Sequence, residues 1–487
     1  MGKKIKNNLK LSRREKRKLH KKNHELYVVM YLIFMTFFIF LIYFAHFVAV
    51  DAKDQINSSY NMRQQNLAKL IIRGKIYSNR GEILAEQALD KNGNEVRYYP
   101  YHELFCHAVG ISSHGGIGVE KSGNITLLTS DSPPAEKLEK EMYGVRNYGD
   151  DIYTTFDMKL QKAASDALGV YKGAIIAMEP KTGRILAMVS RPDFDPNTVS
   201  ENWALLSQDN ARSPLLNRAT QGLYPPGSTF KIVTLLQYLR EHNEDYEDYR
   251  YNCKGHFDLE DVRIDCYHGS VHGRVDLRSS FAKSCNSSFA YMGSILSIDR
   301  FHKTCEGLLF NKNLPLDLPT SKSSYTLSND SDTEERLQSA IGQGKVLMTP
   351  MHLCMLTSCI ANDGILMVPY EIDKYTNYLG AVISETEPKK YGRLMSEEEA
   401  ARLKDYMAEV VKTGTGKKLN GLNYTVAGKT GSAEYGSVKG DSHAWFTGFS
   451  NIEDPELVVT IIMEGAGSGG DYAVPMAKRV FDAYYSS

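Results

Sequence analysis

The most constraining feature of this sequence is an uncharged apolar run near its beginning. Residues 26–50 read LYVVMYLIFMTFFIFLIYFAHFVAV and contain no Lys, Arg, Asp or Glu. A helix of these 25 residues would be about 37 Å long, which exceeds the roughly 30 Å hydrocarbon core of a bilayer. The run therefore predicts one transmembrane helix over residues 26–50, with some tilt.

A basic tail before the run predicts its orientation. Residues 1–25 contain 11 of the 58 Lys and Arg residues but only 2 of the 58 Asp and Glu residues. By the positive-inside rule, this tail is expected in the cytoplasm and residues 51–487 on the other side of the membrane. A cleaved signal peptide is the alternative, because Val50-Asp51-Ala52 is an acceptable cleavage pattern. The length of the basic region and of the apolar run favours a retained anchor.

The exported part of the chain is acidic. Without the tail, 47 basic residues stand against 56 acidic ones, although the whole chain has no net charge. A nucleic-acid-binding domain needs a basic face. The composition therefore argues against nucleic acid as a partner.

The exported part divides into two predicted regions. Residues 51–165 begin with a weakly periodic helical stalk to about residue 70 and continue as an irregular β-rich module. Residues 166–487 predict an α+β domain, in which GAIIAME, PKTG and RILAMVS form an antiparallel hairpin over residues 173–190. The hairpin is expected to share one sheet with C-terminal strands at 442–449 and 456–464. Helices are expected at 231–241, 277–296, 346–361, 397–412 and 473–485.

Seven cysteines leave at least one thiol without an intramolecular partner. Cys253 and Cys266 lie in one polar loop, and in an exported domain a local disulfide is the plain interpretation. Three histidines lie nearby, so a Cys/His metal site is the alternative, and the sequence leaves both open. These histidines are His256, His268 and His272. Inert core thiols are expected where cysteines lie among apolar residues: Cys285, Cys354 and Cys359.

Three short motifs could carry chemistry, and each occurs more than once. Ser-x-x-Lys begins at Ser228 and Ser280; Ser-x-Asn begins at Ser59, Ser122, Ser200 and Ser284; Lys-Thr-Gly begins at Lys181, Lys412 and Lys429. A short motif by itself is weak evidence. The surrounding sequence has to decide between the copies.

The Ser-x-x-Lys copy at Ser228 has the better context. It follows Tyr-Pro-Pro-Gly and precedes the helical run KIVTLLQYL, which places Ser228 near a helix N-terminus. Lys231 is then three residues along the same helix face, so its amine can reach the Ser228 hydroxyl. A serine needs such an adjacent base to act as a nucleophile. Ser280 and Lys283 lie inside a predicted helix, with no turn before them.

The other two motifs are chosen in the same way. Ser284 and Asn286 lie among small and apolar residues, whereas the other Ser-x-Asn copies lie in polar loops. Lys429 begins the only Lys-Thr-Gly copy on a predicted strand, where glycines allow a ligand to approach the backbone. Such a strand can pair with an extended peptide. Lys181 lies in the hairpin turn, and Lys412 ends a helix with Gly414 as its expected cap.

In this order, the three motifs resemble those of the penicillin-recognising serine acyl-transferases. The sequence is similar to class B penicillin-binding proteins, the peptidoglycan D,D-transpeptidases of cell elongation and division. Further segments carry the resemblance: RGKI at 73–76, NRGEILA at 79–85, GVE at 118–120, IGQG at 341–344, TP at 349–350 and HAWFTG at 443–448. The resemblance implies a transpeptidase fold with helices on the faces of an antiparallel sheet. In this family the module at 51–165 corresponds to a pedestal, and the protein lies in the bacterial cell membrane.

The resemblance also implies a role for each motif residue. Ser228 attacks the carbonyl of the penultimate D-Ala of a stem peptide, and Lys231 is the general base. Ser284 relays the proton to the leaving amine with the help of Lys429, and Asn286 holds the peptide amide.

The Lys-Thr-Gly strand would bind substrate through Thr430, Gly431 and Ser432, with the two hydroxyls on the terminal carboxylate. The backbone N–H groups of Ser228 and Ser432 would form the oxyanion hole. No metal or cofactor takes part. The implied partners are stem peptides ending in D-Ala-D-Ala, β-lactam antibiotics and a membrane glycosyltransferase of the SEDS type.

Three related functions fit the sequence less well. A β-lactamase has little use for an anchored module at 51–165. A β-lactam sensor needs a cytoplasmic signalling domain, and the 25-residue tail has no room for one. A bifunctional polymerase–transpeptidase needs more than about a hundred residues before its transpeptidase domain. The sequence leaves open whether the protein serves the septum or the side wall.

Overall fold

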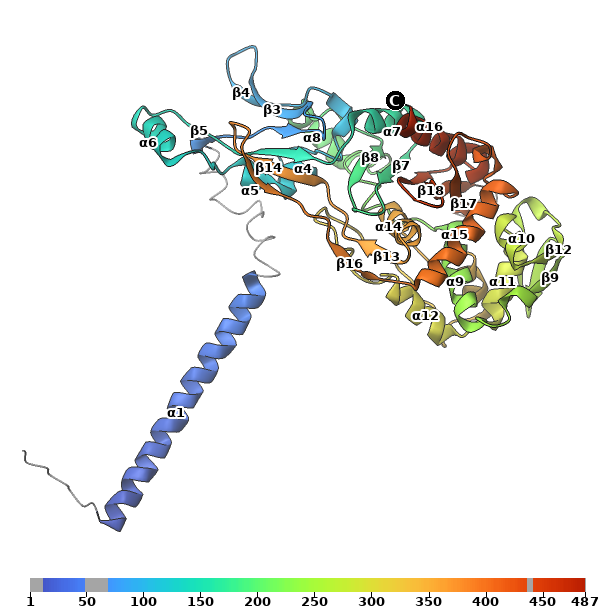
Figure 1. Cartoon of the computed structure of the whole chain (residues 1–487), viewed down its shortest axis with the longest axis horizontal. Helices are drawn as coiled ribbons and strands as arrows, with labels where there is room; N and C mark the ends of the chain where they lie inside the picture. The colour runs from blue at the N-terminus through green and yellow to red at the C-terminus, as the bar shows by residue number, and fades with distance from the viewer. Residues whose placement is uncertain (1–11, 49–68, 436–440, 487) are drawn as a thin grey trace, which may run out of the picture. The chain divides into compact units, whose positions relative to one another are not determined.

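The computed structural model describes residues 12–48, 69–435 and 441–486 (Figure 1). It divides into two compact units, residues 1–62 and 63–487, which are treated separately below. The predicted helical stalk falls almost entirely at residues 49–68, outside the described residues.

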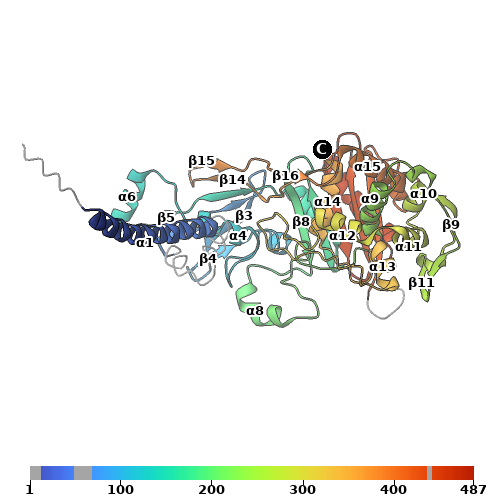
Figure 2. The same ribbon diagram turned by 90° about the horizontal axis from the view of Figure 1, so that it is seen from below.

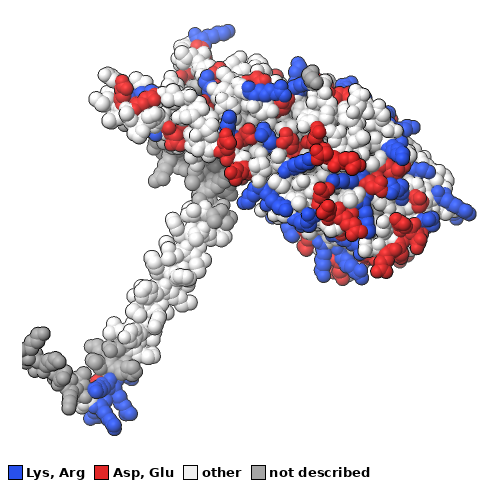
Figure 3. Space-filling view, in the orientation of Figure 1, with Lys and Arg blue, Asp and Glu red and all other residues white. Residues whose placement is uncertain are grey.

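The first unit contains one long helix, α1 (Arg13–His46). Ser12 caps it and forms a capping box with Glu15, which explains why the helix begins within the basic tail. Its part from His24 to His46 has a mean hydropathy of 2.5 and is the one described helix that is long and apolar enough to cross a membrane. Figure 3 shows this uncharged surface, with basic side chains at the N-terminal end of the helix. The predicted apolar helix is thus present and extends further toward the N-terminus than residue 26.

The centre of the second unit is an antiparallel five-stranded sheet. Its strands are ordered β17-β18-β19-β7-β8. The bounds are β7 (Gly173–Met178), β8 (Ile185–Arg191), β17 (Val426–Glu434), β18 (Ser442–Ser450) and β19 (Val458–Met463). The predicted hairpin and the predicted union of both ends of the domain in one sheet are confirmed. β17 is an edge strand, so one of its sides has no neighbouring strand in the part of the chain that the structure describes.

Helices cover both faces of this sheet, which explains why β7, β8 and β19 are nearly continuous apolar runs. α7 (Met158–Leu168) and α16 (Val474–Tyr485) pack on the face that carries Ile175 and Ile461. α14 (Pro350–Ala361) packs on the face that carries Ile176 and Ile462. The predicted α+β fold with helices on the faces of an antiparallel sheet is therefore present.

A group of helices lies beside α14 (Figure 2). The group comprises α9 (Lys231–Glu241), α10 (Leu277–Ala282), α11 (Asn286–Ile295), α12 (Ile298–Gly307), α13 (Thr333–Ala340) and α15 (Glu397–Lys412). The bounds of two helices expected from the sequence, 277–296 and 346–361, need correction. The predicted helix 277–296 is broken between α10 and α11, where Ser284 has a φ of 55°. The predicted helix 346–361 begins only at Pro350, because Thr349 caps it and proline occupies its first turn.

The irregular β-rich module contains a six-stranded sheet ordered β15-β14-β6-β2-β3-β4. Four strands come from the first half of the chain: β2 (Ile76–Tyr77), β3 (Ile83–Leu89), β4 (Glu95–Tyr98) and β6 (Asp151–Thr154). The other two, β14 (Ile372–Thr376) and β15 (Val382–Glu385), come from more than 200 residues later in the chain and lie beside them (Figure 2). The division of the chain at residue 165 stays a prediction.

A buried ion triad links three segments of this module. Glu120 is 1% exposed and pairs with Arg73 at 2.6 Å and with Arg97 at 2.7 Å. Arg73 also donates to Asn124 Oδ1, and Arg97 donates to Gly74 O. Burial by itself would raise the pKa of Glu120, but the two guanidinium groups outweigh it and hold this pKa below its usual value. The two guanidinium groups therefore share one buried carboxylate as their counter-charge.

Candidate active site

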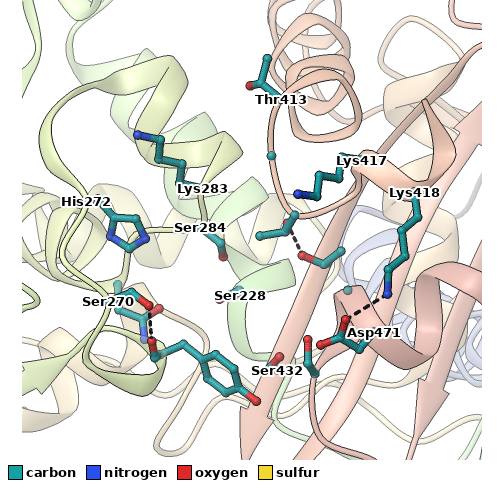
Figure 4. Close-up of a pocket in the computed structure, with 17 residues that line it drawn as sticks. Ser228, Ser270, His272, Lys283, Ser284, Thr413, Lys417, Lys418, Ser432 and Asp471 are labelled. Carbon is teal, nitrogen blue, oxygen red and sulfur yellow. Dashed lines mark hydrogen bonds and ion pairs between the residues drawn. The ribbon is translucent and has the colours of Figure 1, made fainter. Parts of the chain in front are cut away.

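A cavity of about 440 Å³ opens where three elements meet: the turn before α9, the α10–α11 junction and the edge strand β17 (Figure 4). Its lining includes five of the eight residues singled out from the sequence: Ser228, Ser284, Asn286, Thr430 and Ser432. Two more, Lys231 and Lys429, are fully buried and bonded to Ser284. Gly431 lies between Thr430 and Ser432 on β17. Folding thus brings all eight residues together.

Ser228 lies in a tight 3₁₀ turn, Gly227–Phe230, directly before α9. Gly227 has a φ of 52°, and a Cβ there would lie 2.8 Å from the carbonyl oxygen of Ser432. Only glycine allows the turn to pack so closely on β17. The Ser228 side chain is partly exposed in the cavity and has no hydrogen-bond partner among the described residues.

Two buried lysines converge on the Ser284 hydroxyl. Lys231 Nζ donates to Ser284 O and to Asn286 Oδ1, each at 2.7 Å, and lies 3.4 Å from Ser284 Oγ. Lys429 Nζ donates to Ser284 Oγ and to Thr430 O, each at 2.9 Å. Among the described residues, no carboxylate pairs with either amine.

This environment lowers the pKa of both amines. Burial lowers the pKa of Lys231 to about 8, although the nearby thiols of Cys285 and Cys266 oppose the shift. Burial and then the charge of Lys231 lower the pKa of Lys429 well below its usual value. Burial disfavours the charged form of an amine, and two neighbouring ammonium groups repel each other. The site therefore lowers the proton affinity of both amines, so that Lys231 loses its proton near pH 8.

The Ser-x-Asn motif forms the junction between α10 and α11. Ser284 is a non-glycine residue with positive φ, an uncommon and strained conformation that is frequent at functional sites. Asn286 Nδ2 donates to the carbonyl oxygen of Asp265 at 3.0 Å, which orients the amide oxygen toward Lys231. The junction thus holds a hydroxyl between two amines.

The Lys-Thr-Gly motif lies on β17, the free edge of the five-stranded sheet. Thr430 Oγ1 bonds to Thr415 Oγ1, and Ser432 Oγ accepts a bond from the N–H of Gly469 at 3.2 Å. A Cβ on Gly431 would lie 3.0 Å from Thr229 Cγ2, so the motif glycine lets the serine turn approach the strand. The free edge can accept an extended peptide as an additional strand.

The other copies of Ser-x-x-Lys and Lys-Thr-Gly begin at residues in structural positions. The Ser-x-Asn copy at Ser59 lies outside the described residues. Ser280 is fully buried, and its hydroxyl accepts a bond from Ser288. Lys181 lies in the β7–β8 turn and pairs with Asp454, and Lys412 is the last residue of α15. The expectation that Gly414 is the helix cap is wrong. Thr413 has that place, and Gly414 is needed because a Cβ there would lie 2.1 Å from the carbonyl oxygen of Ala282.

The sequence reasoning missed several residues of the cavity wall, which Figure 4 shows around Ser228. These are Tyr267, Ser270, His272, Lys283, Thr413, Gly414, Thr415, Lys417, Lys418, Ser468, Gly470 and Asp471. Lys283, Thr413 and Gly414 belong to the motif copies at Ser280 and Lys412, and the other residues come from segments without a motif. The threonine-rich run KTGTG at 412–416 offered a signal. A second cavity of about 1000 Å³ shares Ser228, Asn286 and Ser432 with the first. The candidate nucleophile therefore stands where two cavities meet.

A cluster of four possible metal ligands lies behind the Ser-x-Asn motif. All seven cysteines are free thiols, so the expected Cys253–Cys266 disulfide is absent, and the two sulfur atoms lie 3.7 Å apart. His272 and Cys285 complete the cluster. Cys285 is buried, as expected for an inert core thiol, but folding places its sulfur 3.8 Å from that of Cys266. Cys354 and Cys359 are buried, and burial raises the pKa of each thiol to about 12, as expected for inert core thiols.

Comparisons with known proteins agree with this geometry. A family model described as the penicillin binding protein transpeptidase domain matches residues 173–482. The peptidoglycan D,D-transpeptidase PbpA of Mycolicibacterium smegmatis is 30% identical over 438 residues, which cover 84% of this chain and 88% of the relative.

Solved structures of a related protein carry β-lactams. Penicillin-binding protein A from M. tuberculosis, in a ceftriaxone acyl-enzyme complex, superposes with a TM-score of 0.78 at 28% identity, covering 86% of this chain and all of that one. Its penicillin G acyl-enzyme complex gives a TM-score of 0.76 at 28% identity, covering 85% of this chain and 99% of that one.

Proposed function

The chain belongs to the family of penicillin-binding protein transpeptidases and is a peptidoglycan D,D-transpeptidase, and we propose that it works through an acyl-enzyme on Ser228. One observation carries the proposal. The Ser228 hydroxyl has no partner among the described residues and lies one helical turn from a fully buried lysine whose pKa is lowered to about 8. A nucleophile next to a base whose pKa lies close to neutral pH is the arrangement that acyl transfer needs.

Lys231 is the proposed general base. A neutral amine has two N–H groups, and the oxygens of Ser284 and Asn286 accept one bond each. Its lone pair is then free to take the proton of Ser228 as Oγ attacks the carbonyl carbon of the penultimate D-Ala. The carbonyl oxygen becomes an oxyanion, which the backbone N–H groups of Ser228 and Ser432 stabilise.

Ser284 is the proposed proton relay in the next step. Its hydroxyl lies between the two amines, so a proton can pass from Lys231 through Ser284 Oγ to the amine of the leaving D-Ala. Lys429 orients this hydroxyl. The C–N bond breaks, free D-Ala leaves, and the remaining acyl group stays on Ser228 Oγ. The amine of a second stem peptide then attacks this ester and forms the cross-link.

Substrate binding is assigned to the strand β17 and to Asn286. Thr430 and Ser432 present hydroxyls to the terminal carboxylate, and Gly431 keeps the backbone accessible. The two cavities that meet at Ser228 fit a reaction with two peptide substrates, a donor and an acceptor. β-Lactams resemble the D-Ala-D-Ala end and acylate the same serine.

We also infer the setting of the enzyme. The apolar helix anchors it in the bacterial cell membrane, with residues 1–25 in the cytoplasm. The pedestal at 51–165 and the transpeptidase domain at 166–487 then lie on the other side of the membrane. A SEDS-type membrane glycosyltransferase is the proposed partner that supplies glycan strands. Protease added to spheroplasts should degrade residues 51–487, and protection of that part would contradict the orientation.

The acyl-enzyme is tested with benzylpenicillin. The full-length protein should gain the mass of one penicilloyl group, and peptide mapping should place it on the peptide with Ser228. Ser228→Ala should abolish the adduct, whereas Ser280→Ala, at the buried copy of the motif, should retain it. An adduct on any other serine would overturn the assignment.

A further inference from the structure

Three side chains in a row on β17 face the two cavities. Side chains of a strand alternate between its faces, so Thr430, Ser432 and Glu434 lie on one face at intervals of about 6.7 Å. Thr430 and Ser432 line the first cavity, and Ser432 and Glu434 line the second. Thr430 is buried, Ser432 is half-buried and Glu434 is exposed. The row therefore offers two hydroxyls and then a carboxylate to one extended ligand.

The first cavity, at the Thr430 end of the row, is basic. Its wall includes Lys283, Lys417 and Lys418, and its one carboxylate is that of Asp471. Lys418 pairs with Asp471 at 2.9 Å. Lys283 and Lys417 pair with no carboxylate in the part of the chain that the structure describes. This end of β17 is therefore suited to a negatively charged group.

The second cavity carries the opposite charge. Its wall includes Arg263, Asp265 and Glu434. Arg263 pairs with Asp265 at 2.9 Å. No cation of the described ranges 12–48, 69–435 and 441–486 pairs with the Glu434 carboxylate. This end of β17 is therefore suited to a positively charged group.

The main chain of Glu434 is already bonded on its free side. With its amide oxygen toward this residue, Gln343 accepts a bond from Glu434 N–H at 3.0 Å and donates one to Glu434 O at 3.2 Å. These are groups that an added peptide strand would otherwise bond. A peptide that pairs with β17 therefore leaves the strand before Glu434, and only the side chain of Glu434 is open to it.

Aromatic rings line the same cavity. Tyr435 follows Glu434, and its ring stacks on that of His443 with 4.1 Å between the centroids. Tyr267 lines both cavities. Aromatic rings pack against the methylene groups of a long side chain and attract a cation to their faces. The surroundings of Glu434 thus suit an aliphatic side chain that ends in a cation.

The proposed mechanism sets the direction of the donor peptide along β17. Its terminal carboxylate lies at Thr430, and the carbonyl group of its penultimate residue lies at the N–H of Ser432. An extended peptide advances about 3.4 Å per residue, so the residue before D-Ala-D-Ala comes next, beside Glu434. Donor and acceptor are both stem peptides, so the donor also carries a cross-linking amine. Such an amine is a cation wherever it is not reacting.

We propose that Glu434 binds the side-chain ammonium group of the residue that precedes D-Ala-D-Ala in the donor peptide. This specificity subsite rests on the acyl-enzyme mechanism proposed above. The donor then spans both cavities, with its carboxylate in the basic one and its ammonium group in the other. When D-Ala leaves, the first cavity opens to the acceptor, while Glu434 still holds the acyl group. Opposite charges at the two ends of the row disfavour reversed binding.

Two penicillins that differ in one charge test the subsite. Both are made from aminopenicillanic acid: one carries an Nα-acetyl-lysyl group with a free side-chain amine, and the other an Nα,Nε-diacetyl-lysyl group. The full-length protein in detergent should be acylated about three- to fivefold faster by the first, the size expected of an exposed ion pair. Glu434→Gln should react equally fast with both, and Glu434→Lys should prefer the diacetyl compound. The control Glu453→Gln, in the exposed turn between β18 and β19, should keep the wild-type preference.

Ionic strength separates recognition of a charge from a structural role. Salt at about 1 M screens exposed charges beyond roughly 3 Å, so the wild-type preference should shrink, while the ratio of rates for Glu434→Gln should stay the same. Equal wild-type rates with the two penicillins at low salt would overturn the subsite and leave the acyl-enzyme standing. A preference that persists in Glu434→Gln would also overturn it. No adduct with either penicillin would instead refute the acylation of Ser228, and the subsite with it.

Discussion

Two buried charged clusters in this protein are built on opposite principles. In the pedestal, Glu120 lies between Arg73 and Arg97, and each charge has a partner. In the active site, Lys231 and Lys429 are equally buried, yet their contacts among the described residues are with hydroxyl, amide and carbonyl oxygens. The paired cluster stays ionised and holds the fold. The unpaired amines lose affinity for their protons, and a general base needs this property.

The largest expected effect on acylation comes from removing the amine of Lys231, the proposed general base. Lys231→Met keeps the volume of the side chain but removes the base, so acylation by benzylpenicillin should slow by about 10²–10⁴-fold. Stability should not fall, because a buried amine without a carboxylate partner is costly to the fold. Stopped-flow acylation and thermal unfolding measure the two effects. Lys412→Met, at the end of α15, is the control and should leave both unchanged.

We expect the ion triad to respond in the opposite way: a substitution there should lower the stability of the protein and leave the acylation rate unchanged. Glu120→Gln leaves two guanidinium groups buried without a counter-charge, and breaking a buried pair costs about 3–5 kcal/mol of unfolding free energy. Denaturant titration measures the loss, with the exposed Glu139→Gln as control. The acylation rate of the molecules that remain folded should match that of the wild type. A large fall in that rate would show that the two clusters are coupled.

Removing the amine of Lys429 should slow acylation nearly as much as removing the amine of Lys231. Lys429→Met removes the donor that orients Ser284 Oγ and the positive charge beside the developing oxyanion. Loss of such a donor typically costs about 10²–10³-fold, so acylation should slow to this extent. Lys181→Met, in another Lys-Thr-Gly copy, is the matched control. Equal losses at the two positions would mean that the choice between motif copies is wrong.

The smallest effect is the dependence of acylation on pH. Below its pKa of about 8, Lys231 is protonated and cannot accept the proton of Ser228; above it, the amine is neutral. The acylation rate should therefore rise about tenfold between pH 7 and pH 9 and then level off. Lys231→Met should be slow and flat over the same range. A wild-type rate that falls as the pH rises would contradict a lysine base.

Much of the fold could be predicted from local patterns in the sequence. The hairpin of β7 and β8, helices α9 and α15 and the C-terminal strands follow from apolar periodicity and from Pro, Gly and Ser at the ends of elements, and their bounds agree closely with expectation. The choice of Ser228, Ser284 and Lys429 over their copies also followed from local context. Folding brings these three residues into one site.

The remaining features of the fold and of the candidate site depend on contacts between segments that are distant in the chain. The sequence by itself determined an apolar helix, an α+β domain and three motifs with their order, because these depend on residues close together in the chain. Only the tertiary structure added β14 and β15 to the sheet of the pedestal, broke the helix at Ser284 and placed Cys285 beside Cys266. It also buried the two lysines away from any described carboxylate. The strain at Ser284 and the proton affinity of Lys231 both depend on burial and on contacts between segments that are distant in the chain. Local residue spacing therefore could not predict either of them.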